Sequence, residues 1–554
     1  MTGDGGVEDP RADLRWGTVP ALLSEAAARL GEEEALVDAD RRLSFVQLSA
    51  EAAGVTRALM ASGVEKGDRV ALWAPNCAGW AVAALGALGA GAVLVPLNTR
   101  FKGGEAAYIL RASGARLLFT VRGFLGVDYP ALLDGEDLGD LAETVLLDPE
   151  AGPPGPGPAA TGFSEFLARK EEVDPDAAAR RSTSVGAGDV SDLIFTSGTT
   201  GRPKGVVATH GQSLRTFGTW GSIVGLREGD RYLVVNPFFH TFGYKAGLLA
   251  CLMAGATALP EPVFDVTAVL ERVAAERVTV LPGPPTLYQS ILAHPDRAAH
   301  DLSSLRLGVT GAAVVPVELV VAIREELGFD TVLTAYGLTE SCGTVTMCRR
   351  SDPPQVVART SGRAIPGVEV QVVGDDGTEL PRGEAGEIVV RGYTVTAGYW
   401  EDPAATAAAI DPAGWLHTGD IGVMDDVGNV TVTDRLKDMY VVGGFNAYPA
   451  EVEAMLRGCP GVGPLAVVGV ADERLGEVGC VFLVRPDAAA DADSTLARRV
   501  LEWGRAQMAN YKAPRHAVVV DALPLNASGK VLKGELRERF ARGETPIVTY
   551  EGSK

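Results

Sequence analysis

Amphipathic stretches and short apolar runs alternate along the first 150 residues of the chain. Apolar residues at helical spacing predict helices over 19–30 and 45–62, and apolar runs predict strands over 69–73, 92–96 and 116–120. Strands separated by helices of this length are typical of βαβ units. Because such units place their strands side by side in one direction, this region is expected to form a mostly parallel sheet.

The same alternation resumes after residue 190. Further strands are expected at 193–196, 232–236, 257–259, 278–281 and 305–310. Between the two regions, residues 151–158 (Ala-Gly-Pro-Pro-Gly-Pro-Gly-Pro) predict a surface connection, because such a proline and glycine run forms neither helix nor strand. An α/β fold is therefore predicted for most of the chain.

A different pattern begins near residue 368. Short alternating runs at 368–373, 386–391 and 428–433 are separated by glycine and aspartate turns, which favours a small antiparallel barrel or sandwich. A boundary is expected at 434–438. Beyond it, a compact α+β unit is predicted from the runs 451–456, 465–470, 480–484 and 496–508.

One uncharged segment, 80–96, raises the question of a membrane helix. It is dominated by alanine and glycine, falls short of spanning length, and has Pro75 and Pro96 near its ends. A buried helix over 79–90 that leads into a buried strand over 92–96 explains it better. No integral membrane segment is therefore expected.

Composition narrows the function. The net charge of −21 disfavours a nucleic-acid partner, because the phosphate backbone would be repelled. Six cysteines are scattered without the spacing of metal ligands, as expected for free thiols in a reducing compartment. The acidic, polar N-terminus does not fit a signal peptide, so the cytoplasm is the expected location.

The segment 196–205 (Thr-Ser-Gly-Thr-Thr-Gly-Arg-Pro-Lys-Gly) carries the clearest chemistry. It follows an apolar run and combines three glycines, four hydroxyls and two cations. Glycines let the backbone approach an anion, and hydroxyls and amides donate to phosphate oxygens. The spacing is not that of a P-loop NTPase. A loop that closes over a triphosphate is predicted, with a flexible surface loop as the alternative.

Four further motifs follow in order, at 336–340 (Tyr-Gly-Leu-Thr-Glu), 415–420 (Trp-Leu-His-Thr-Gly-Asp), 434–438 (Asp-Arg-Leu-Lys-Asp) and 524–530 (Pro-Leu-Asn-Ala-Ser-Gly-Lys). Together with the loop they closely resemble the core motifs of the adenylate-forming superfamily. This superfamily comprises acyl-CoA synthetases, peptide-synthetase adenylation domains and luciferases. The resemblance runs from about residue 15 to 540.

The resemblance implies both an architecture and a reaction. The architecture is a large N-terminal core, 1–433, made of two doubly wound αβ subdomains and a small β-barrel at about 366–433. A hinge at 434–438 and a mobile α+β C-terminal lid, 439–554, would follow. The reaction is ATP-dependent activation of a carboxylic acid to acyl-AMP and pyrophosphate, followed by attack of a thiol. Such a site needs cations, a metal and amide donors rather than a protein nucleophile.

The resemblance also assigns the nucleotide site. The phosphates would lie on the loop, and the adenosine on residues from the later motifs. Mg²⁺ would be held by Glu340, with Thr196 beside it, and Thr339 would donate to the α-phosphate. The full ATP and AMP set is Thr196, Ser197, Gly198, Thr199, Thr200, Lys204, Gly311, Ala312, Ala313, Tyr336, Gly337, Asp420 and Arg435.

Three further positions carry the chemistry and the domain motion that the resemblance implies. Lys530 would bridge the carboxylate and the α-phosphate during adenylation. Lys437 lies at the hinge position, where many relatives carry aspartate. Gly443 and Gly444 would line the channel for the pantetheine arm of CoA. CoA is the expected acceptor because no carrier-protein segment follows the motif at 524–530.

The expected acyl pocket mixes aromatic and small residues, which favours a bulky, mainly apolar acid; its members are Phe239, Phe242, Tyr244, Lys245 and Thr310, with 311–313 beside them. His240 would close over the carboxylate or guard the pantetheine channel, with a buried structural histidine as the alternative. Lys245 would contact the substrate, or else be a surface lysine whose stem alone is buried.

The segments 236–247 and 280–290 resemble the actinobacterial ligases that activate the indane-dione propanoate left from steroid rings C and D. A medium- or long-chain fatty acyl-CoA ligase is the alternative within enzymes. A non-catalytic AMP or acyl-adenylate sensor is the alternative outside them. A homodimer is the expected assembly.

Overall fold

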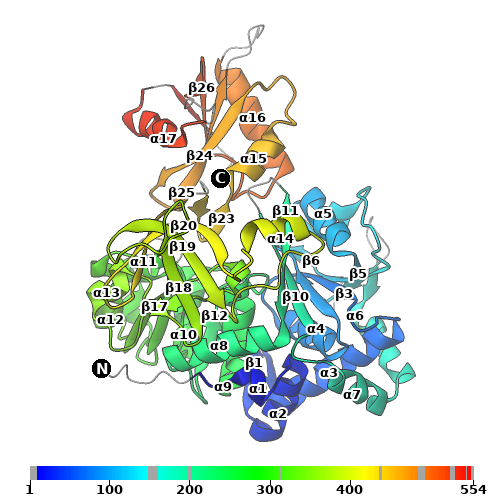
Figure 1. Cartoon of the computed structure of the whole chain (residues 1–554). Coiled ribbons are helices and arrows are strands. Elements are labelled where there is room, and N and C mark those ends of the chain that lie inside the picture. Colours follow the sequence, from blue (N-terminus) through cyan, green and yellow to red (C-terminus); the bar gives the residue numbers. More distant parts are fainter. Residues whose placement is uncertain are drawn as a thin grey trace. The chain divides into compact units, whose positions relative to one another are not determined.

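A seven-stranded sheet organises the first part of the chain in the computed structural model, which describes residues 9–147, 160–197, 202–311, 315–435, 439–484, 493–524, 531–544 and 546–550. Its strand order is β11-β10-β4-β3-β5-β8-β9, and the pairs from β10 to β9 that are resolved in register run parallel (Figure 1). The strands are β3 (Arg69–Trp73), β4 (Val93–Pro96), β5 (Ala115–Thr120), β8 (Glu143–Leu146), β9 (Ala160–Gly162), β10 (Val190–Ser197) and β11 (Pro203–Thr209). The predicted parallel sheet is confirmed.

Helices α3 (Phe45–Ala61) and α4 (Ala78–Gly89) pack against each other beside this sheet. Helix α3 begins at a capping box in which Ser44 and Gln47 exchange side-chain and backbone hydrogen bonds. A Cβ added at Gly86 would lie 2.5 Å from Cβ of Val55 on α3, so the glycines of α4 permit close helix contact. The predicted core segment 80–96 is thus confirmed as α4 followed by β4.

A second set of strands lies in two linked sheets, ordered β12-β13-β1-β2 and β14-β15-β16-β17. The strands are β12 (Arg231–Val234), β13 (Thr257–Pro260), β1 (Glu34–Asp38), β2 (Arg41–Ser44), β14 (Leu307–Thr310), β15 (Thr331–Tyr336), β16 (Thr346–Met347) and β17 (Arg363–Ala364). Val280 forms parallel bridges to Tyr232 on one side and to Leu307 on the other. The strand expected at 278–281 is therefore reduced to one bridging residue, because Pro282 follows directly and has no N–H to extend the ladder.

The region after 366 forms an antiparallel sheet of order β18-β19-β20-β21. Its strands are β18 (Val368–Val373), β19 (Ala385–Gly392), β20 (Leu416–Met424) and β21 (Val430–Arg435). Strand β20 carries residues 416–420 of the motif at 415–420, so Asp420 is part of a strand and has paired strands beside it.

Contacts divide the chain into two units. The first comprises residues 1–99, 106–195 and 205–433, and the second comprises 100–105, 196–204 and 434–554. Both are mixtures of helices and strands, in agreement with the predicted fold class.

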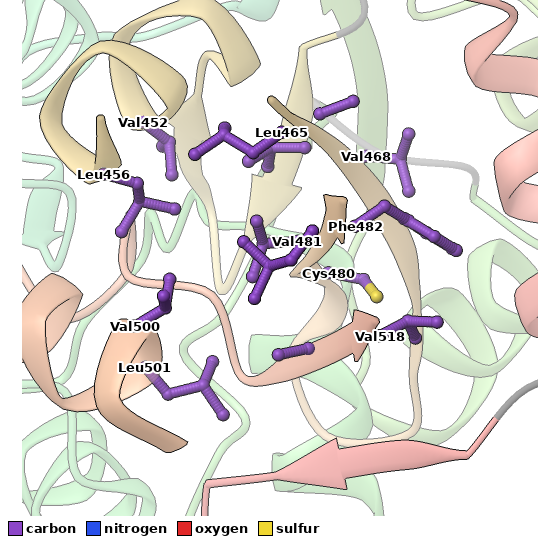
Figure 2. Packing of buried hydrophobic residues seen from close by; sticks show 14 of the residues in the cluster. Val452, Leu456, Leu465, Val468, Cys480, Val481, Phe482, Val500, Leu501 and Val518 are labelled. Atoms are coloured by element: carbon purple, nitrogen blue, oxygen red, sulfur yellow. The ribbon is translucent and has the colours of Figure 1, made fainter. Parts of the chain in front are cut away.

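The second unit is built on the antiparallel pair β24 (Leu465–Asp472) and β25 (Gly476–Val484), with β26 (His516–Val520) parallel to β25. Side chains from these strands meet helices α15 (Pro449–Leu456) and α16 (Asp493–Gln507) in one core. Figure 2 shows Val452 and Leu456 of α15 and Val500 and Leu501 of α16 around Val481. The remaining elements are β22 (Tyr440–Val442), β23 (Phe445–Ala447), α17 (Lys533–Arg542) and β27 (Ile547–Thr549).

Across the described ranges, none of the helices combines the length and the apolar character needed to cross a bilayer.

Candidate active site

Strands β14 and β15 end beside each other, and the predicted nucleotide residues follow from their ends. They run parallel, with Thr310 paired to Thr334 in register. In open parallel sheets, ligands bind beyond the carboxyl ends of the strands, where backbone groups and short loops converge. Tyr336 is the last residue of β15 and Thr310 the last of β14, so both lie at this edge.

Tyr336 and Asp420 contact each other directly. The phenol of Tyr336 donates a hydrogen bond of 2.6 Å to Oδ2 of Asp420. Asp420 is 4% exposed, and its backbone N–H donates to the hydroxyl of Thr418, which in turn donates to the carbonyl of Ile388. The Tyr336 hydrogen bond therefore holds the carboxylate beside an aromatic ring. A carboxylate held in this way can accept the paired hydroxyls of a ribose.

Gly337 begins a tight turn after Tyr336. A Cβ at this position would lie 2.5 Å from the backbone carbon and oxygen of Gly343, so only glycine fits. The resemblance places Gly337 in the nucleotide set, and the structure adds a packing reason for glycine at this position. The turn continues as a 3₁₀ helix, η5 (Thr339–Ser341), whose start is closed by a 2.9 Å bond from the N–H of Leu338 to Oγ of Ser341.

Glu340 lies on this 3₁₀ helix and contacts Tyr399. The phenol of Tyr399 donates to Oε1 of Glu340 at 2.9 Å, and the N–H of Thr396 donates to the Glu340 carbonyl at 2.8 Å. Tyr399 was not among the residues predicted from the sequence. Its signal was the aromatic pair that follows Gly398, at Tyr399 and Trp400.

The same segment reaches the strand that leaves the loop at 196–205. The N–H of Trp400 donates to the carbonyl of Gly205 at 2.7 Å, and the N–H of Val207 on β11 donates to the carbonyl of Gly398 at 3.1 Å. A Cβ at Gly205 would lie 3.1 Å from the ring of Phe195, so the aromatic ring occupies the space that a side chain would need. Glu340 and β11 are therefore connected through residues 396–400.

The chemistry around Glu340 fits a Mg²⁺ ion held jointly by protein and nucleotide. Among the described residues, no group of three or more His, Cys, Asp or Glu side chains could form a metal cage. Mg²⁺ is commonly bound by one or two carboxylates together with substrate phosphates. A single carboxylate held by Tyr399 matches that pattern.

The expected acyl segment folds as a π-helix, η3 (Phe242–Leu249), after a loop fixed by Asn76. The amide of Asn76 donates to the carbonyls of Val234 and Asn236 and accepts the N–H of Phe238 at 2.6 Å. At Gly243 a Cβ would collide with the carbonyl of Pro237. π-Helical turns of this kind occur frequently at functional sites.

The aromatic residues of this segment differ in exposure. Tyr244 is fully buried and tilts against Trp80, with ring centroids 5.6 Å apart. Phe242 meets Trp220 edge to face at 5.9 Å, and Phe239 is half-buried. Burial raises the pKa of the Tyr244 phenol well above its ordinary value. The hydroxyl is therefore a neutral donor at physiological pH.

His240 is exposed, and its Nδ1 accepts the N–H of Phe242 at 3.2 Å. The surrounding protein nevertheless desolvates the ring and lowers its pKa, so the choice between a substrate contact and a structural histidine stays a prediction. Because Nδ1 is an acceptor, the proton of the neutral ring lies on Nε2, which is the atom available to a ligand.

Lys245 is buried, and the surface-lysine alternative is wrong. Its ammonium lies 2.8 Å from Oδ1 of Asp192 on β10, and both side chains are 1% exposed. Burial lowers the pKa of Lys245, but the Asp192 carboxylate outweighs this effect and the net pKa is raised. Lys245 is therefore charged and paired within the protein.

The remaining predicted residues are placed in part or not at all. Thr196 and Lys204 are half-buried at the two ends of the loop. Gly443 and Gly444 form the exposed turn between β22 and β23, with φ of 55° and 88°. Only the backbone is described for Ser197 and Arg435. Outside the described residues lie Gly198, Thr199, Thr200, Ala312, Ala313, Lys437 and Lys530.

The chain matches two family models in the expected order. Residues 23–400 match the AMP-binding enzyme family, and residues 451–530 match the AMP-binding enzyme C-terminal domain. The match therefore includes the loop, the Tyr336–Glu340 turn and the acyl segment.

Two curated relatives cover nearly the whole chain. A 3-(7a-methyl-1,5-dioxo-octahydro-1H-inden-4-yl)propanoyl:CoA ligase from Rhodococcus jostii is 49% identical, over 94% of this chain and 98% of the relative. The long-chain-fatty-acid–CoA ligase FadD13 of Mycobacterium tuberculosis is 34% identical, over 91% of this chain and 94% of the relative.

A solved structure shares the fold. MatB from Rhodopseudomonas palustris, determined with ATP bound, aligns with a TM-score of 0.66 and 29% identity, over 94% of this chain and 99% of that protein.

Proposed function

The chain belongs to the AMP-binding enzymes and is an acyl-CoA ligase, and from this premise we propose that its acid is a bicyclic diketo propanoate derived from steroid rings. The observation that carries the proposal is the 49% identity with a ligase of that acid along nearly the full length of both chains. The products are the CoA thioester, AMP and pyrophosphate. The ATP-bound relative supports ATP as a co-substrate, and the CoA ligase activity of the curated relative supports CoA.

Two buried hydroxyls support a keto acid over a linear fatty acid. Among the described residues, neither the Tyr244 phenol nor Oγ1 of Thr310 has a hydrogen-bond partner, although both are buried. A buried donor without an acceptor costs free energy, on the order of 1–3 kcal/mol. A ketone oxygen on the substrate would satisfy such a donor, whereas an alkyl chain would not.

In the proposed nucleotide site, the loop at 196–205 holds the phosphates and Lys204 supplies positive charge. Asp420 accepts the ribose hydroxyls, with Arg435 as a further donor, and the ring of Tyr336 lies against adenine. Glu340 and Thr196 hold Mg²⁺, which neutralises phosphate charge when bound. Lys530 stabilises the transferring group during adenylation, Lys437 serves as the hinge, and Gly443 and Gly444 border the pantetheine arm.

The decisive experiment measures pyrophosphate release with Mg-ATP and CoA across a panel of acids, with mass detection of the thioester. The panel contains the bicyclic diketo propanoate, the same ring system without its ketones, and linear fatty acids from short to long. We expect the highest kcat/KM for the diketo acid. A preference for linear acids would overturn the substrate and favour the alternative that FadD13 supports.

Two variants connect that result to the pocket. Tyr244→Phe and Thr310→Val each remove one hydroxyl with little change of shape. We expect each to lower kcat/KM for the diketo acid on the order of tenfold and to leave the ketone-free ring system unchanged. Equal losses on both acids would show that these hydroxyls do not recognise ketones.

The non-catalytic sensor is tested by the same assay. A sensor would bind AMP but release no pyrophosphate with any acid. Location in the cytoplasm and assembly as a homodimer remain predictions from the sequence.

A further inference from the structure

A buried cluster of three side chains lies within the first unit, and the proposed reaction does not use it directly. The Lys245 ammonium is 2.8 Å from Oδ1 of Asp192 and 3.7 Å from Sγ of Cys342. Oδ2 of Asp192 accepts the hydroxyl of its neighbour Ser191 at 2.7 Å. Sγ of Cys342 also lies 3.9 Å from Oγ of Ser213 on α8 (His210–Val224).

The three members come from three functional segments. Asp192 is on β10, four residues before the loop residue Thr196. Lys245 is on η3, the acyl segment. Cys342 follows η5, two residues after Glu340. The ion pair therefore joins the segments proposed to hold the phosphates and the acid, and the contact between Lys245 and Cys342 adds the segment proposed to hold the metal.

Stability alone is a weak reason for this arrangement. Taking two charges out of water carries a large desolvation cost, and apolar residues of similar volume often stabilise a core equally well. In some proteins, however, a buried ionic group is retained because it specifies one arrangement of the chain over others. Lys245 lies on the acyl segment and contacts side chains from the other two segments, which matches such a role.

The cluster holds a turn with an unusual backbone conformation at Cys342. Cys342 has a φ of 54°, in the left-handed region that residues other than glycine rarely adopt. The next residue, Gly343, has a φ of 91°, and a Cβ there would lie 2.5 Å from Cγ2 of Thr241, the residue that precedes η3. Strained residues persist only where surrounding contacts fix them, and they concentrate at active sites.

We propose that Lys245 is a positioning residue: through Asp192 and Cys342 it fixes the Glu340 turn against the acyl segment. The role rests on the proposed function, because Glu340 is the proposed Mg²⁺ ligand. Lys245 itself touches neither metal nor nucleotide in this account. Its loss shifts the Glu340 carboxylate and the acid relative to each other.

The test removes both charges together. Lys245→Met or Asp192→Asn alone leaves an uncompensated buried charge or donor, and each is expected to lower the thermal midpoint. The double variant Lys245→Met/Asp192→Asn is expected to recover most of that loss. It should still show a fall in adenylation kcat on the order of 10²-fold at saturating ATP and acid, because small displacements at a reacting centre have effects of that size.

A second readout does not depend on turnover. Calorimetric titration gives the affinity for ATP with Mg²⁺ and with EDTA, and the ratio reports how well the protein holds the metal. We expect that ratio to fall several-fold in the double variant, while the affinity measured in EDTA stays unchanged.

Two further variants separate positioning from packing. Asp230 and Arg306 form another mostly buried ion pair, just before β12 and β14 begin, at the opposite ends of those strands. Asp230→Asn/Arg306→Met should reduce stability without changing the Mg²⁺ ratio. Cys342→Gly relaxes the φ strain but removes the thiol, so the Mg²⁺ ratio should fall with little loss of stability.

Each outcome decides the matter. A double variant, or a Cys342→Gly variant, with a wild-type Mg²⁺ ratio and a wild-type kcat would overturn the proposal. If the double variant does not fold, Cys342→Gly alone carries the test. A wild-type protein that releases no pyrophosphate with any acid would overturn the proposed function, and that result is visible before any variant is compared.

Discussion

The Tyr336 phenol donates a 2.6 Å hydrogen bond to Oδ2 of Asp420, which joins the end of β15 to the middle of β20. The backbone N–H of Asp420 also donates to the hydroxyl of Thr418. One ring and one carboxylate are thus fixed together although they lie 84 residues apart. An adenosine that stacks on the ring would bring its ribose hydroxyls to the carboxylate.

This contact predicts how each residue contributes to ATP binding. Tyr336→Phe keeps the ring but frees one Asp420 oxygen, so we expect KM for ATP to rise on the order of tenfold, the usual size for a hydrogen bond to a charged group. Asp420→Ala should raise it further and remove the preference for ATP over 2′-deoxy-ATP. Pyrophosphate release at varied nucleotide concentration measures both.

The comparison with 2′-deoxy-ATP serves as the control for misfolding. A variant that is merely damaged loses activity with both nucleotides in proportion. If Asp420→Ala still preferred ATP as strongly as the wild type, the carboxylate would not be the ribose acceptor.

Glu340 predicts a specific dependence on Mg²⁺. Glu340→Gln removes the charge but keeps an oxygen that can accept the Tyr399 hydroxyl, so the turn should remain folded. We expect the half-saturating Mg²⁺ concentration to rise strongly and kcat to fall on the order of 10²–10³-fold. Tyr399→Phe removes only the hydrogen bond, and its effect on Mg²⁺ should be about fivefold. A Glu340→Gln variant that responds to Mg²⁺ like the wild type would disprove the metal role.

The sequence predicted the elements whose pattern is regular. Helix α2 (Val19–Leu30) and strand β3 agree with their expected ranges because amphipathic spacing and an apolar run are unambiguous. Strand β20 was recognised only as a motif, since His417, Thr418 and Asp420 interrupt its apolar pattern. Its hydrogen bonds to β19 form regardless of those side chains.

The site residues could be named from motifs, but their contacts could not. Nothing local in the sequence pairs Tyr336 with Asp420 or Glu340 with Tyr399, because tertiary folding alone brings them together. Lys245 shows most clearly that contacts between distant residues cannot be predicted from sequence motifs. Its partner Asp192 is a polar residue within an apolar strand, and neither residue marks the other in the sequence.

Lys530 predicts a separation between the two half-reactions. Lys530→Ala should slow adenylation on the order of 10²–10⁴-fold, because a charge close to the transferring group is lost. Thioester formation from chemically prepared acyl-adenylate and CoA should be much less affected. ATP–pyrophosphate exchange and single-turnover thioester formation measure the two steps separately.

Lys533 offers a matched control three residues further on. Its ammonium lies 2.9 Å from Oε1 of Glu453 within the second unit. Lys533→Ala removes the same charge from the same region, so any general electrostatic effect should appear there too. Equal losses of exchange in both variants would contradict a special role for Lys530.

His210 predicts a loss of stability in mild acid. The ring is 1% exposed at the start of α8, and Nδ1 accepts the N–H of Val19 at 3.3 Å. Burial lowers its pKa to about 4. The unfolded chain takes up a proton near pH 6.5 and the folded chain does not, so stability is full above that value and declines as pH falls toward 4. At about pH 5 the loss should be about 2 kcal/mol.

Other groups also titrate in this range, so the variant His210→Asn isolates the contribution. Asparagine can accept the Val19 N–H but takes up no proton. The free energy of unfolding of the unit that contains His210 is measured by urea unfolding at about pH 7 and about pH 5. The difference between the two pH values should be smaller in the variant by about 2 kcal/mol, whatever the cost of the substitution itself. The same pH effect in both proteins would mean that His210 becomes protonated in the folded state, and that its burial does not exclude the charge.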